Sequence, residues 1–163
     1  MLGAAEALPI VDGCVDVVIM SLILHQCVDR PQAIREVYRV LRPGGRLVVR
    51  TVLPEVALSE WVPFRFFPKV AALEASRMPA LDDMLTMYRQ AGFTEVHTST
   101  VCANTSIDFH QLAEELRPRT RPSYHLLTDE ELAEGIHQIE QEWVVKGGLW
   151  IEPKPHLFMT GIK

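Results

Sequence analysis

The sequence predicts an α/β fold that contains at least one pair of parallel strands, and two observations predict it. Residues 15–20, VDVVIM, are β-branched and almost continuously apolar, which is typical of a central strand covered on both faces. A helical pattern, the turn Pro43-Gly44-Gly45 and a second apolar run at residues 46–53 follow. A strand, a helix and a strand in this order form a βαβ unit, so we expect the two strands to be parallel neighbours.

Composition and charge narrow the class of protein. The chain has 163 residues, enough for one domain, and its 16 basic and 21 acidic residues give a net charge of -5. This charge disfavours nucleic acid and anionic lipid as partners. The longest apolar run, residues 17–24, is shorter than a membrane span, so no membrane partner is expected either. The three cysteines, Cys14, Cys27 and Cys102, have no metal-ligand spacing, and we interpret them as reduced thiols of a cytoplasmic protein.

The first helix and the segment after the second strand have clear sequence signals. Asp29-Arg30-Pro31 is a helix start, and a stripe of apolar residues follows it at helical spacing: Ile34, Val37, Tyr38 and Leu41. After residue 53 the pattern breaks, because residues 54–79 contain four prolines and a dense aromatic cluster.

The second half of the chain alternates helices and strands. Residues 82–91 are helical in pattern and Gly92 stands where a left-handed residue ends a helix. Further elements are predicted in order: a strand at 93–103, a helix at 108–116, a helix opened by the capping box at 128–131, and a strand at 156–162. The helix opened by the capping box has one apolar face, formed by Leu132, Ile136, Ile139 and Trp143, and Gly147-Gly148 ends it.

Several blocks of the first hundred residues resemble one enzyme family. They are, in order, AEALP at 5–9, Asp12-Gly13, the run from VDVV at 15–18 through Leu24-His25, RVLRPGGRL at 39–47 and AGF at 91–93. Their order and spacing are similar to those of class I S-adenosylmethionine-dependent methyltransferases, in the group that includes the ubiquinone and menaquinone biosynthesis methylases. The RVLRPGG block is the most specific of them.

The resemblance implies an α/β fold with a Rossmann-like methyltransferase sheet, truncated at the N-terminus. We expect about four strands, the last antiparallel, in a single domain over residues 1–163 with helical insertions at about 54–81 and 104–150. The family's glycine-rich turn, which approaches the cofactor, would precede Met1, and Ala4 stands where the family has an aspartate that binds adenine. The cofactor site of this chain is therefore expected to be incomplete.

The resemblance also implies site residues. S-adenosylmethionine would contact five residues: Ala5, Glu6, Ser21, Leu22 and His25. His25 is also the candidate general base, and the alternative is a capping histidine with no chemistry. The acceptor would be a small molecule bound by four aromatic residues: Trp61, Phe64, Phe67 and Tyr124. Alternatively, these aromatics only fill the core beneath a long loop.

Other groups leave their role open. The six histidines show no HExxH motif and no pair four residues apart, so no metal is assigned. The run 117–121, RPRTR, either meets an acidic group or is a solvated loop. The strand Val15–Met20 would lack a neighbour, so we expect a second copy, as in a dimer, or a complementing chain at its edge. The alternative to an enzyme is a methyltransferase-like module for dimerisation or partner binding.

Overall fold

The computed structural model describes residues 3–146 and 149–163, and the chain separates into two compact units. Unit 1 comprises Met1–Leu53, Met78–Val101 and His156–Lys163, and unit 2 comprises Pro54–Arg77 and Cys102–Pro155. That residues 1–163 form a single domain with insertions stays a prediction. None of the helices in the described ranges is long and apolar enough to cross a membrane.

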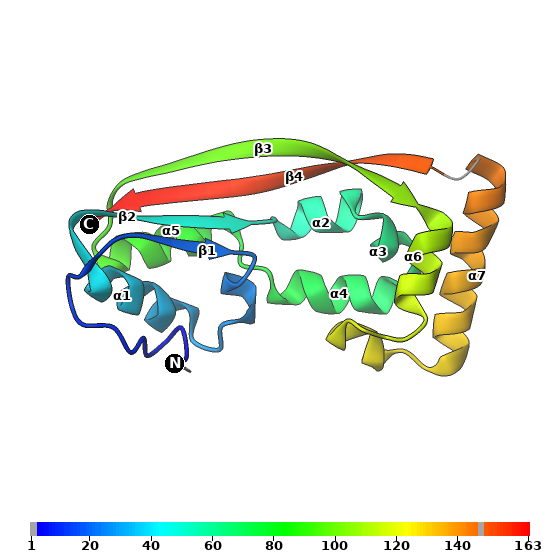
Figure 1. The fold of residues 1–163 in the computed structure, drawn as a ribbon, viewed down its shortest axis with the longest axis horizontal. Coiled ribbons are helices and arrows are strands. Elements are labelled where there is room, and N and C mark those ends of the chain that lie inside the picture. Colours follow the sequence, from blue (N-terminus) through cyan, green and yellow to red (C-terminus); the bar gives the residue numbers. More distant parts are fainter. Residues whose placement is uncertain (1–2, 147–148) are drawn as a thin grey trace. The chain divides into compact units, whose positions relative to one another are not determined.

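The strands form a four-stranded mixed sheet in the order β1-β2-β4-β3 (Figure 1). Their bounds are β1 Val15–Ser21, β2 Leu41–Thr51, β3 Thr94–Asp108 and β4 Leu149–Ile162. β1 and β2 are parallel and β4 pairs with β2 in the antiparallel direction. The prediction of a Rossmann-like sheet with a parallel β1–β2 pair and an antiparallel last strand is confirmed.

In unit 1, helices α1 (Arg30–Val40) and α5 (Leu81–Ala91) pack against one face of the sheet. Asp29 begins α1 by accepting a hydrogen bond from the backbone amide of Gln32 at 2.9 Å. Gly92 ends α5 with a φ of 101°, the left-handed conformation that the sequence predicted. The core between helices and sheet contains Ile34, Val37, Leu47, Val49, Met84, Tyr88 and Met159.

The opposite face of β1 is uncovered. Val17 is 52% exposed and Ile19 is 68% exposed, whereas Met20, which points to the helices, is 5% exposed. β1 also forms one edge of the described sheet. The interpretation of β1 as a central strand covered on both faces is therefore wrong for this chain, since its apolar side chains are buried on one face only.

The Pro43-Gly44-Gly45 turn is built into the start of β2 rather than preceding it. The register jumps from Val15 opposite Leu41 to Val17 opposite Arg46, so the turn bulges out of the pair. Gly44 has a φ of 79°, and a Cβ on Gly45 would lie 2.8 Å from the carbonyl oxygen of Arg42. Because the bulge accommodates the extra residues of the turn, β1 and β2 remain paired on both sides of it.

Unit 2 is largely helical. Its helices are α2 Pro54–Glu60, α3 Val62–Phe66, α4 Pro68–Arg77, α6 Phe109–Leu116 and α7 Asp129–Lys146, with a 3-10 helix, η2, at Pro122–Leu126. Three of the four prolines that interrupt the sequence pattern, Pro54, Pro63 and Pro68, lie in the first turns of α2, α3 and α4, where a missing backbone N–H costs nothing. The segment after residue 53, where the sequence pattern breaks, therefore forms three short helices.

The long helix α7 begins as its sequence predicted. Thr128 and Glu131 form the capping box, with the backbone amide of each donating to the side chain of the other. Leu132, Ile136 and Ile139 are buried. Trp143, predicted on the same face, is 41% exposed and contacts the ring of His110 instead. The predicted end at Gly147-Gly148 lies outside the described residues.

Candidate functional site

Three of the predicted cofactor residues lie at or just after the carboxyl end of β1. Ser21 is the last residue of the strand, and Leu22 has a φ of 53°, a left-handed conformation that is rare for a branched residue. The amide of Leu22 donates to the carbonyl of Arg50 at 2.9 Å, which ties the turn to β2. His25 lies in the short 3-10 helix η1 (Leu24–Gln26), half-buried. The structure therefore gathers Ser21, Leu22 and His25 at one end of the sheet.

The other two predicted cofactor residues, Ala5 and Glu6, are held at the start of α1. The Glu6 carboxylate accepts hydrogen bonds from the backbone amides of Val28 and Asp29 at 2.9 and 3.2 Å. Backbone hydrogen bonds, first its own and then that of Asp29, lower the pKa of Glu6. Its carbonyl oxygen accepts from the Gln32 side chain at 3.4 Å. Glu6 thus holds its loop against residues 28–29, and its carboxylate already accepts hydrogen bonds from the chain itself.

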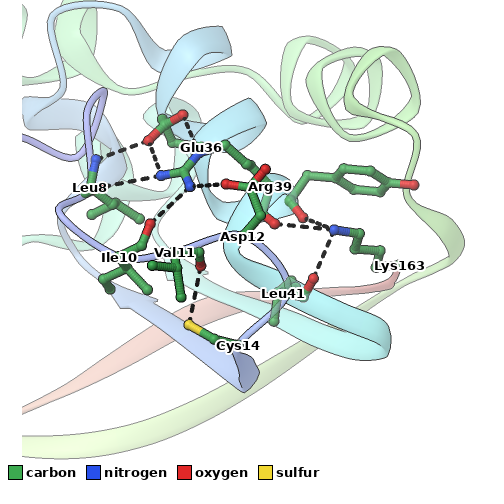
Figure 2. Close-up of polar contacts among 10 residues, drawn as sticks. Leu8, Ile10, Val11, Asp12, Cys14, Glu36, Arg39, Leu41 and Lys163 are labelled. Carbon is green, nitrogen blue, oxygen red and sulfur yellow. Dashed lines mark hydrogen bonds and ion pairs between the residues drawn. The ribbon is translucent and has the colours of Figure 1, made fainter.

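Further along, residues 8–13 are held by α1 through one ion-pair network (Figure 2). Arg39 pairs with Asp12 and with Glu36, and it also donates to the carbonyls of Leu8 and Ile10. The hydrogen bond from Arg39 is the largest cause of a lowered pKa of Glu36, which also accepts from the Leu8 amide. The loop that carries Ala5 is therefore positioned by charged side chains at both of its ends.

Two residues at the carboxyl end of the sheet were missed by the sequence analysis. Arg50, on β2, directs one guanidinium nitrogen to His156 Nε2 at 2.9 Å and another to the Ser21 hydroxyl at 3.4 Å. His156 lies on β4, 106 residues away in sequence. No motif connects the two positions, so only the strand pairing reveals the cluster.

The four aromatic residues predicted to bind the acceptor all lie in unit 2, in two contacting pairs. The rings of Trp61 and Phe64 are 5.2 Å apart, and those of Phe67 and Tyr124 are 5.1 Å apart. Phe64, Phe67 and Tyr124 are buried. This arrangement is compatible with both interpretations of the aromatics, as pocket wall and as core.

Two buried polar atoms in this aromatic group have no partner among the described residues. They are the hydroxyl of Tyr124 and the indole Nε1 of Trp61. Burial raises the pKa of Tyr124 to about 12, so the hydroxyl stays protonated at neutral pH. Buried donors of this kind usually find a hydrogen-bond acceptor.

Unit 2 contains a pocket of about 530 Å³, within the size range of small-molecule sites. Its apolar wall includes Phe66, Phe67 and Leu127, and its rim carries Lys69 paired with Glu131. Of the four predicted acceptor residues, only Phe67 lines it. The ring of Phe67 lies on Gly135 of α7, where a Cβ would come within 2.1 Å of the ring.

Two other candidate functions were metal binding and the binding of an acidic group by the arginine run at 117–121. In the part of the chain that the structure describes, no group of three or more His, Cys, Asp or Glu side chains is placed to hold a metal. In the arginine run, Arg117 pairs with Glu114 and Glu140, and Arg119 pairs with Asp129. These arginines therefore meet acidic groups of their own chain.

Comparisons with known proteins find methyltransferases by sequence and by structure. Residues 1–49 match the family model described as "Methyltransferase domain". Over 99% of this chain, the structure aligns with a putative methyltransferase from an antibiotic biosynthesis pathway of Anabaena variabilis, with a TM-score of 0.73, 20% identity and 72% of that chain covered. The chain therefore shares the Rossmann-like fold of this methyltransferase.

Among curated proteins, the chain is similar to the ubiquinone/menaquinone biosynthesis C-methyltransferase of Haemophilus ducreyi, with 33% identity over 111 residues. The match covers 57% of this chain and 43% of that protein, so the chain spans less than half of this relative. A structure of Haemonchus contortus phosphoethanolamine N-methyltransferase 2 in complex with S-adenosyl-L-methionine aligns with a TM-score of 0.50, 13% identity, 98% of this chain and 35% of that one. These comparisons show that the chain shares its fold with methyltransferases and that its sequence similarity to them covers part of the chain.

Proposed function

We propose that this chain takes part in transferring the methyl group of S-adenosylmethionine to a small-molecule acceptor. The observation that carries the proposal is the parallel β1–β2 pair, whose carboxyl end gathers Ser21, Leu22 and His25. In open α/β sheets, ligands bind beyond the carboxyl ends of the strands. β1 and the start of β2 also lie within the residues that match the methyltransferase family.

We infer that the residues present would contact the cofactor through backbone groups rather than through an acidic side chain, as part of a site that the sequence predicts to be incomplete. The backbone amide of Ala5 forms no hydrogen bond with any described residue, whereas the polar groups of Glu6 are engaged at the start of α1. We assign Ala5 as a backbone donor to the cofactor and Glu6 as the residue that positions it. Ser21 and Leu22 would hold the cofactor beside the strand end.

The bound cofactor supplies a methyl group activated by the sulfonium, so the chain's main task is to align the acceptor. His25 would accept a proton from the acceptor's hydroxyl or amine as the methyl group is transferred. Within unit 2, and considered by itself, the group Trp61, Phe64, Phe67 and Tyr124 would bind an acceptor with an aromatic or aliphatic body. The burial of Phe64, Phe67 and Tyr124 among apolar side chains supports such a body.

Calorimetry with S-adenosylhomocysteine tests the proposal on the purified chain. We expect saturable binding at sub-millimolar concentration, and its absence would contradict the proposal. Ser21→Phe should abolish this binding because the new ring fills the space at the strand end. The matched control is Val17→Phe, which lies on the same face of β1 and is 52% exposed. If both variants bind as the wild type does, the carboxyl end of β1 is not the cofactor site.

We further propose that the open edge and face of β1 bind a second copy of the chain or a complementing chain. The exposure of Val17 and Ile19 supports this, because apolar edge strands tend to pair. Size-exclusion chromatography with light scattering should show an assembly larger than 18.4 kDa at micromolar concentration. Ile19→Lys should shift it to the monomer, and a stable wild-type monomer would overturn the proposal.

We also propose a cytoplasmic location. The thiols of Cys14, Cys27 and Cys102 are all free, which supports a reducing compartment. Fractionation of cells that express the tagged protein should recover it with cytoplasmic markers. Recovery in a membrane or extracellular fraction would contradict this location.

A further inference from the structure

The Arg50 side chain lies among neutral groups at the candidate cofactor end of the sheet. Its β1 neighbour in the strand register is Ser21, and the two side chains share the face that also carries Val17 and Ile19. Arg50 as a residue is half-buried, and its guanidinium contacts the Ser21 hydroxyl and the His156 imidazole. Within the described residues, no carboxylate lies within ion-pair distance of Arg50.

The lack of a carboxylate partner distinguishes Arg50 from six other arginines in the described ranges. Those that pair with a carboxylate are Arg39, Arg42, Arg65, Arg77, Arg117 and Arg119. A half-buried guanidinium that meets only neutral partners keeps an uncompensated charge, which attracts an anion. Arg46 lies on the same face of β2 but is exposed, so water solvates its charge.

The geometry of these contacts leaves Arg50 able to accept such a partner. A guanidinium has five donors arranged for two-point contact with a carboxylate. Only two are directed to side chains, and the contact with Ser21 is long, at 3.4 Å. The contact with His156 fixes the orientation of the side chain. A carboxylate could therefore replace the serine contact without rearranging the strand.

We propose that Arg50, oriented by His156, binds a carboxylate at the carboxyl end of β1 and β2. The carboxylate belongs either to the acceptor or to the aminoacyl end of the cofactor, and this assignment rests on the proposed function. The left-handed turn at Leu22, whose amide bonds to the Arg50 carbonyl, lies directly beside the site. Strained backbone of this kind is concentrated at ligand sites.

The first experiment titrates the purified chain with benzoate, with benzamide as the neutral control, by NMR. We expect benzoate to shift the amide signals of Ser21 and Leu22 in a saturable way and benzamide to leave them unchanged. Arg50→Met should weaken benzoate binding by about tenfold or more, since the charge-assisted pair is lost. Arg46→Met removes the same charge four residues earlier on the same face and should leave binding unchanged.

The second experiment separates the two sources of the carboxylate. If the ligand is the cofactor, Arg50→Met weakens binding of S-adenosylhomocysteine but not of 5′-methylthioadenosine, which lacks the aminoacyl group. If the ligand is the acceptor, Arg50→Met weakens benzoate binding and leaves both nucleosides unaffected. Arg50→Lys keeps the charge without the two-point contact and should fall between the wild type and Arg50→Met.

Failure of this inference is distinct from failure of the proposed function. Equal binding of benzoate and S-adenosylhomocysteine by the wild type and Arg50→Met overturns the carboxylate site while the methyltransferase proposal stands. Binding of benzoate that depends on Arg50, without binding of either nucleoside, supports the carboxylate site and contradicts the methyltransferase proposal. Absence of binding by any of these probes overturns both.

Discussion

The two ends of the β1–β2 pair use charge in opposite ways. At the amino end, Arg39 pairs with a carboxylate, and Lys163 donates to the carbonyls of Tyr38, Arg39 and Leu41 (Figure 2). Arg42 also pairs with a carboxylate at this end. At the carboxyl end, Arg50 contacts only a hydroxyl and an imidazole. Internal pairing at the first end holds the chain together. At the carboxyl end Arg50 has no such carboxylate partner among the described residues, so its charge is available to a ligand.

The comparison separates residues that stabilise the fold from residues available for function. Paired groups at the amino end lose free energy when one partner is removed, because the other partner is left unsatisfied. Removing Arg50 leaves no carboxylate behind. Substitutions at the amino end should therefore affect stability, and those at the carboxyl end should affect binding.

The largest effect is expected for Gly45→Ala at the amino end. The new Cβ would lie 2.8 Å from the Arg42 carbonyl oxygen and 3.1 Å from that of Asp16, and backbone atoms cannot move aside cheaply. The free energy of unfolding should fall by about 3 kcal/mol. Gly44→Ala is the matched control: nothing lies within 4 Å of its Cβ, so only the positive φ costs about 1 kcal/mol. Urea denaturation measures both, and equal losses would contradict the packing at Gly45.

Lys163→Met should have the next largest effect. The ammonium donates to carbonyls at the end of α1 and lies 4.8 Å from the ring centroid of Tyr38. A cation at a helix C-terminus contributes about 1 to 2 kcal/mol when it is partly buried. Methionine keeps most of the apolar stem, so thermal or urea unfolding isolates the charge. An unchanged midpoint would show that these contacts do not stabilise α1.

A smaller effect, confined to the loop before β1, is expected at acid pH. The pKa of Glu6 and that of Glu36 are both lowered in the folded chain, so these carboxylates stabilise the loop above their ordinary pKa near 4.5. That contribution is lost as the pH falls below this value through the lowered pKa. Hydrogen exchange of the Leu8 amide, which donates to Glu36, should accelerate in this range relative to the Met20 amide. Glu36→Gln should weaken this dependence, and an identical response of both amides would contradict it.

Arg50→Met should have the smallest effect on stability. Its partners are a serine and a histidine at the carboxyl end of β1 and β2, and neither is charged with the opposite sign, so the free energy of unfolding should change by about 0.5 kcal/mol or less. Chemical denaturation beside Lys163→Met gives the direct comparison of the two ends. A loss as large as that of Lys163→Met would show that Arg50 is a structural residue.

The sequence predicted the elements whose signals are local. The apolar run at 15–20, the capping residues Asp29 and Thr128, and Gly92 each act within a few residues, and each is where the pattern placed it. Prolines concealed three helices, because a proline in a first turn and a proline that breaks a helix look alike in sequence. The apolar pattern of β1 also could not tell burial on one face from burial on two.

The candidate site was predictable where it follows the strand end and not where it depends on pairing. Ser21, Leu22 and His25 come directly after a recognisable strand, so their grouping follows from the strand itself. Arg50 and His156 become neighbours only because β4 returns antiparallel to β2. The occupation of the Glu6 carboxylate by the amides of Val28 and Asp29 was equally invisible, since those residues lie more than twenty positions away.

The most direct test is a map of amide shifts on adding S-adenosylhomocysteine to the purified, isotopically labelled chain. The account predicts saturable shifts at Ala5, Ser21 and Leu22, and unchanged signals at Asp12, Gly44 and Lys163. Shifts centred on the amino end, or none anywhere, would contradict a cofactor site beyond the carboxyl ends of β1 and β2.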